Sequence, residues 1–67
     1  MYSLEQYKQA IDNTPRSWQG LPLQAKKKSA FCVSRRTDPE TKKMWTMYNT
    51  IEDNKEVFFV VADGKIL

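Results

Sequence analysis

The sequence predicts an α+β domain in which an N-terminal helix and a short helical connector pack on an antiparallel β-meander of three or four strands. Apolar residues recur at helical spacing near the N-terminus, and alternation with a period of two begins near residue 30. An unbroken apolar run over residues 57–62 lies between polar turns, which is typical of a strand buried on both faces. A chain of 67 residues is short enough to form one small domain, residues 1–67.

The helix is predicted over residues 4–12, where apolar side chains recur on one face. Ser3 and Gln6 have the spacing of a capping box, in which the side chain of each residue accepts a hydrogen bond from the backbone N–H of the other. Pro15 disfavours helical geometry at the residue before it, so the helix should end near residue 13.

The connector that follows should contain short helical turns over residues 16–19 and 23–28. Gly20 is placed to end the first turn and Pro22 to open the second. Trp18 is its expected anchor in the core, because tryptophan side chains bury large apolar areas.

Strands are expected over residues 30–36, 42–51, 57–62 and 65–67. Connections of four or five residues favour hairpins, since parallel strands need longer crossovers. Asp38-Pro39 is typical of a type I turn, and Asp63-Gly64 of a tight hairpin turn.

Strict alternation places Phe31, Val33 and Arg35 on one face of the first strand. The strand over residues 57–62 is apolar on both faces, and one nine-residue helix covers only one of them. The second face is covered either by the connector around Trp18 or by another chain.

The composition argues against an enzyme. The chain has no histidine, and Cys32 is its only cysteine, which excludes a Cys–His nucleophile, an internal disulfide and the usual zinc ligand sets. The two glycines stand far apart, so no glycine-rich phosphate loop is present. We therefore expect no catalytic residues, no cofactor and no metal, and a packed or half-packed Cys32 thiol.

The sequence also favours a soluble, cytoplasmic protein without a membrane partner. The N-terminal residues lack a basic region followed by an apolar one, and no stretch approaches the roughly 20 apolar residues of a membrane helix. A lone cysteine fits a reducing compartment.

Positive charge is concentrated in the middle of the chain. Residues 15–43 sum to +6, whereas residues 1–14 sum to −1 and residues 44–67 to −2. Such asymmetry suggests an anionic partner. The leading hypothesis is non-catalytic nucleic-acid binding, DNA or RNA, through a basic β-hairpin. The residues expected to make the contacts are Lys26, Lys27, Lys28, Arg35, Arg36, Lys42, Lys43 and Trp45.

The hairpin supplies the reason for this hypothesis. Pairing across Asp38-Pro39 should bring Arg35 and Arg36 next to Lys42 and Lys43, and like charges opposite each other destabilise a sheet. A phosphate counter-anion would relieve the repulsion, and a two-stranded ribbon fits the DNA major groove. The simpler interpretation is that these charges serve solubility and block edge pairing.

The alternative is a small adaptor or inhibitor, of the kind carried by phages or mobile elements, that binds a protein or forms a homodimer. It would use an apolar sheet face with Phe58, Val60 and Trp18 at the interface.

Asp38-Pro39-Glu40-Thr41 with its flanking basic residues is similar to hairpins in the small three-stranded DNA-binding domains of phage-type integrases. The resemblance covers only the hairpin. Those domains place their helix after the sheet, whereas here the helix comes first, so no functional residue is carried over from them.

Overall fold

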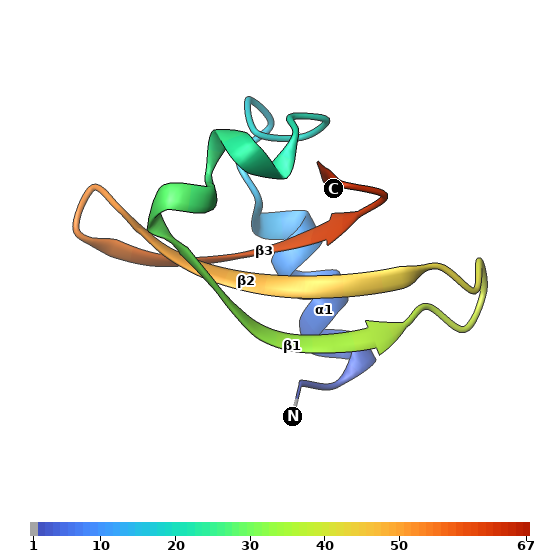
Figure 1. The fold of residues 1–67 in the computed structure, drawn as a ribbon. Coiled ribbons are helices and arrows are strands. Elements are labelled where there is room, and N and C mark those ends of the chain that lie inside the picture. The colour runs from blue at the N-terminus through green and yellow to red at the C-terminus, as the bar shows by residue number, and fades with distance from the viewer. Residues whose placement is uncertain (1) are drawn as a thin grey trace.

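The computed structural model describes residues 2–67, with the side chain of Lys27 excepted. Within these residues, one α-helix packs on a four-stranded antiparallel sheet of order β1-β2-β3-β4 (Figure 1), which confirms the predicted α+β fold. The elements in chain order are α1 (Leu4–Asn13), the 3₁₀ helices η1 (Leu23–Ala25) and η2 (Lys27–Ser29), β1 (Ala30–Thr37), β2 (Met44–Glu52), β3 (Lys55–Ala62) and β4 (Lys65–Ile66).

The capping box at the start of α1 is confirmed. Gln6 N–H donates to Ser3 Oγ at 3.2 Å, and Ser3 N–H donates to Gln6 Oε1 at 2.7 Å. Thr14 follows the helix with φ −67° and ψ 131°, the extended geometry that Pro15 favours in the residue before it. The helix therefore ends one residue later than predicted.

Two apolar clusters lie on opposite faces of the sheet. The cluster on the face that packs against α1, called the α1 face, contains Tyr7, Ala10, Met47 and Val60. The cluster on the other face, called the connector face, contains Trp18, Phe59, Val61 and Ile66. Of the two coverings considered for the second face of β3, the connector is the one observed.

The connector is held by backbone pairing with β4. Gly20 N–H donates to Ile66 O at 2.7 Å, and Ile66 N–H donates to Leu21 O at 2.9 Å. Gly20 has a φ of 87°, which a residue with a side chain adopts only with strain. This pairing seats Trp18 with its ring edge on Phe59, at a centroid distance of 5.7 Å.

A β-bulge in β1 makes the predicted alternation wrong. Cys32 lies opposite Tyr48 and Ser34 lies opposite Met47, so Val33 is an extra residue without a partner on β2. Every side chain after Val33 therefore lies on the face opposite to the predicted one.

The consequence is that the two arginines exchange faces. Arg35 lies on the connector face, and Arg36 shares the α1 face with Phe31. Tyr7 Oη donates to Ser34 Oγ at 2.8 Å, which places Ser34 under α1 in agreement with the shifted register.

The Cys32 thiol is exposed, contrary to the packed or half-packed position predicted for it. The connector cluster includes Ala30 at the start of β1 but does not extend over Cys32.

The last turn is the predicted Asp63-Gly64 hairpin, whereas the β2–β3 turn is tighter than the predicted connection over residues 52–56, because β2 extends to Glu52 and β3 begins at Lys55. Asp53 and Asn54 join β2 to β3 with φ values of 51° and 62°, and Asp63 and Gly64 join β3 to β4 with values of 55° and 77°. Positive φ at both central residues matches the twist of antiparallel hairpins. Among residues 2–67, no helix has the length and apolar character needed to cross a membrane.

Candidate functional site

The loop between β1 and β2 is wider than predicted. It spans residues 38–43, and β2 begins at Met44, two residues later than expected. Lys42 N–H donates to Asp38 O, and Asp38 N–H donates to Lys43 O, each at 2.8 Å. Lys42 and Lys43 therefore belong to the loop, and the prediction that they lie opposite Arg35 and Arg36 across the strands is wrong.

Asp38 organises this loop. Its carboxylate accepts from the Thr41 hydroxyl at 2.6 Å and from the backbone N–H groups of Glu40 and Thr41 at 3.3 Å each. The Thr41 hydroxyl is the main reason that the pKa of Asp38 lies below its usual 3.8, although desolvation acts in the opposite direction. The positive charge of Lys8, on α1, also lowers this pKa.

The two arginines stand at the end of β1 on opposite faces. Arg35 is exposed opposite Thr46, and Arg36 is half-buried opposite Trp45. The Trp45 ring stacks on Tyr7 at a centroid distance of 6.2 Å, so it is part of the packing under α1. The Nε of Arg36 is buried without a hydrogen-bond partner in the described part of the chain.

The two loop lysines differ in their partners. Lys42 has a φ of 65°, an uncommon value for a long side chain. Lys43 Nζ lies 3.0 Å from Asp63 Oδ2 in an exposed ion pair, which contributes roughly 0–1 kcal/mol. We call Arg35, Arg36, Lys42 and Lys43 the hairpin-end cluster; it lies where the β1–β2 loop closes one end of the sheet (Figure 1).

The structure does not bring Lys26 and Lys28 to this cluster. They precede β1, and its eight residues span about 25 Å before the hairpin loop. Lys26 Nζ lies 4.3 Å from the Trp18 ring centroid and 4.0 Å from Glu52 Oε1. Lys28 is exposed, and the side chain of Lys27 lies outside the described part of the structure.

Two of the three residues predicted for a protein interface lie in the core. Val60 is fully buried under α1, and Trp18 of the connector is 7% exposed, packed against the sheet. Neither can contact a partner while the fold is intact. Phe58 is half-buried, and Tyr2 packs on it at a centroid distance of 5.8 Å and an interplanar angle of 52°.

Sequence reasoning missed Phe31 and Ile51, whose side chains are 73% and 60% exposed. Both lie on the α1 face, because Phe31 pairs with Asn49 and Ile51 is two residues further along β2. The signal was present in the lengths: a ten-residue helix is about 15 Å long, whereas the nine residues of β2 span about 30 Å. Part of the α1 face must stay uncovered.

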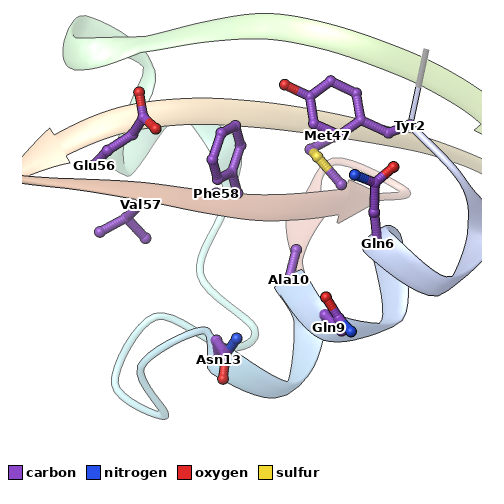
Figure 2. A pocket seen from close by; sticks show the side chains of 9 residues that line it. All are labelled: Tyr2, Gln6, Gln9, Ala10, Asn13, Met47, Glu56, Val57 and Phe58. Carbon is purple, nitrogen blue, oxygen red and sulfur yellow. The ribbon is translucent and has the colours of Figure 1, made fainter.

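A groove of about 340 Å³ lies between α1 and β3 beside this uncovered part, and we call it the α1–β3 groove (Figure 2). Glu56, Val57 and Phe58 form its strand side, and Ala10 and Met47 form its floor. The remaining lining residues are Tyr2, Gln6, Gln9 and Asn13.

A comparison of the chain with protein-family models, with curated proteins and with solved structures finds no match.

Proposed function

We propose that this chain is a small non-catalytic protein that binds nucleic acid through its hairpin-end cluster. The observation that supports the proposal is the placement of four cations around one loop, at the end of a two-stranded ribbon. Lysines and arginines that neutralise phosphates release counterions from nucleic acid, which is the sequence-independent part of its binding.

Arg35 and Arg36 are neighbours in β1, so their side chains lie on opposite faces of the ribbon, and the bulge at Val33 puts Arg35 on the connector face and Arg36 on the α1 face. A ligand that surrounds the hairpin end therefore meets a cation on either side. A two-stranded ribbon has the width that the major groove of B-DNA admits. The carboxylate of Asp38 accepts its hydrogen bonds from Glu40 and Thr41 within the loop.

The proposal is tested by fluorescence anisotropy of labelled duplex DNA, single-stranded DNA and RNA over a range of salt concentrations. We expect the affinity for at least one of them to fall as salt rises, with a slope in log–log form of about −0.9 for each phosphate neutralised on duplex DNA. The variant Arg35→Ala/Arg36→Ala should bind more weakly, with a slope smaller by about 2 on the duplex.

The variant Lys28→Ala/Lys55→Ala is the matched control, because it removes the same charge from exposed positions away from the hairpin loop. It should bind nearly as the unchanged protein does. If the two variants lose the same amount of affinity, binding depends on net charge and not on the hairpin-end cluster. Absence of binding at low salt would exclude the proposed function.

A second candidate, docking on a protein partner, is favoured by the exposed pair Phe31 and Ile51. Register places Phe31, Asn49 and Phe58 in one row across three strands, with Ile51 beside them. Large apolar side chains that are exposed and contiguous often mark an interaction surface.

This candidate is tested by affinity capture of one dominant protein and by light scattering for a homodimer. Phe31→Ser/Ile51→Ser should abolish the association. Met44→Ser is the control, because Met44 is 55% exposed but lies on the connector face. Association that survives the first variant, or that is lost in the control, would rule out this surface.

A further inference from the structure

The α1–β3 groove is built from two kinds of wall. On one side, α1 presents the neutral amides of Gln6, Gln9 and Asn13 along one stripe of the helix. On the other side, Glu56 and Phe58 project from the same side of β3, two residues apart (Figure 2). The volume of about 340 Å³ is in the range of pockets that bind small ligands or a few side chains.

The aromatic residues of the groove suit a cation. Tyr2 and Phe58 form a tilted pair, 5.8 Å between centroids and 52° between planes. Both rings line the groove, and the face of an aromatic ring attracts ammonium and guanidinium groups.

The charge of the groove has the matching sign. Glu56 is the one carboxylate in its lining, and the lining contains neither lysine nor arginine. Glu56 is exposed and forms no ion pair with any side chain that the structure describes. A cation placed beside Phe58 would therefore meet a carboxylate without a competing protein cation.

The surface next to the groove is apolar. Ile51 lies directly opposite Glu56 on β2, and Phe31 is in the same cross-strand row as Phe58. A ligand whose charged group occupies the groove thus has exposed hydrophobic side chains within reach of its neighbouring residues.

We propose that the α1–β3 groove binds an arginine or lysine side chain of a partner protein, from a segment in which apolar residues flank the basic one. The alkyl stem packs on Phe58 beside Gln6 and Gln9, and the charged group lies between Glu56 and the rings of Tyr2 and Phe58. The flanking apolar residues pack on Phe31 and Ile51. This inference rests on the second candidate function and specifies the chemical class of the partner segment.

The test is an NMR titration of the ¹⁵N-labelled chain with the blocked tripeptide acetyl-leucyl-arginyl-leucyl-amide. The same peptide with citrulline in place of arginine is the neutral control, since it keeps the shape and loses the charge. We expect saturable shifts at Glu56, Phe58 and Gln9, and binding of the citrulline peptide weaker by about tenfold.

Two variants refine the titration. Glu56→Gln should weaken the arginine peptide by about tenfold and leave the citrulline peptide unchanged, whereas Glu40→Gln, an equal charge change in the hairpin loop, should change neither. Tyr2→Leu keeps apolar contact and removes the ring, and should weaken the arginine peptide by about threefold. The amide spectrum reports whether each variant is folded.

Three results would overturn the inference. Equal affinity for the arginine and citrulline peptides would show that the positive charge plays no part in binding. If acetyl-arginine-amide binds as tightly as the tripeptide, the flanking apolar residues contribute nothing to binding. Groove shifts that depend on protein concentration and vanish in Arg35→Ala/Arg36→Ala would identify a second copy of the chain as the occupant.

Failure of this inference differs from failure of the candidate on which it rests. If Phe31→Ser/Ile51→Ser abolishes capture of the partner while the two peptides bind alike, the partner surface stands and the cation groove is refuted. If the peptides are discriminated but no partner depends on Phe31 and Ile51, the result supports the groove and rules out the wider surface.

Discussion

The two ends of the sheet differ in their turns, their charge and their cover by α1. At one end, the β1–β2 loop is built around Asp38 and bears the hairpin-end cluster. At the other, the tight Asp53-Asn54 turn joins β2, which ends at Glu52, to β3, which begins at Lys55 and continues with Glu56. The Tyr7 ring packs towards the first end, on Trp45, whereas the apolar side chains of the second end are exposed.

This difference shows how one short helix divides one face of a sheet into a covered part and an open part. Where α1 packs, the apolar side chains of Met47 and Val60 are buried. Where α1 does not reach, Phe31 and Ile51 stay in solvent beside a carboxylate. Under the two proposals, a polyanion binds at the hairpin loop and a basic apolar segment binds at the open end.

The largest expected effect contrasts the covered and the open parts. Phe59 is fully buried, so Phe59→Ala should lower the free energy of unfolding by about 3–5 kcal/mol. Phe31→Ala should change it by less than about 0.5 kcal/mol, because this side chain is 73% exposed. Urea unfolding followed by tryptophan fluorescence measures both values.

A large loss of stability in Phe31→Ala would mean that the α1 face is covered in solution, for example by a second copy. A comparison of the unfolding midpoint at several protein concentrations distinguishes that case, since a dimer becomes more stable as concentration rises.

The contrast between Phe59 and Phe31 also shows what the sequence reveals. The apolar run over residues 57–62 predicts an inner strand, the capping pattern at Ser3 predicts α1, and Asp63-Gly64 predicts the last hairpin; all three are observed. These features are local, so the residues that cause them are adjacent in the chain.

The features that the sequence did not reveal depend on contacts between distant residues. The bulge at Val33 leaves no gap in the alternating pattern, because an extra residue in one strand is visible only against its partner strand. The split between Lys26 and the hairpin-end cluster follows from the length of β1 and from packing on Trp18. Whether Phe31 is exposed depends on where α1 crosses the sheet.

A smaller effect concerns the backbone of the hairpin loop. Lys42 has a φ of 65°, where a residue with a side chain is strained and glycine is not. Lys42→Gly should stabilise the fold by about 1 kcal/mol and weaken nucleic-acid binding, because it removes a cation together with the strain. Unfolding and anisotropy measurements on the same variant would show the two opposite changes.

Asn54→Gly is the matched change at the other end, where φ is 62°. Asparagine tolerates this region better than lysine, so the gain should be a few tenths of a kcal/mol, with no change in binding. Weaker nucleic-acid binding in Asn54→Gly, or unchanged binding in Lys42→Gly, would break the proposed division between the two ends.

The smallest effect is a pH dependence at the hairpin end. Because the folded-state pKa of Asp38 is lowered, its carboxylate stabilises the fold fully above its ordinary pKa of 3.8, and this contribution is lost as pH falls through the lower folded value. Thr41→Val removes the main donor and should raise the pKa of Asp38 towards 3.8, whereas Thr41→Ser should preserve it. Carboxyl ¹³C shifts of Asp38 across the acid range give the result; identical titration in both variants would contradict the role of the Thr41 hydroxyl.

Chemical-shift mapping of the ¹⁵N-labelled chain with a short oligonucleotide at low salt tests the division between the two ends most directly. We predict that the amides of the β1–β2 loop and of Arg35 and Arg36 shift, while those from Glu52 to Glu56 stay in place. Shifts of similar size at both ends, or a response centred on Lys26 and Lys28, would contradict it.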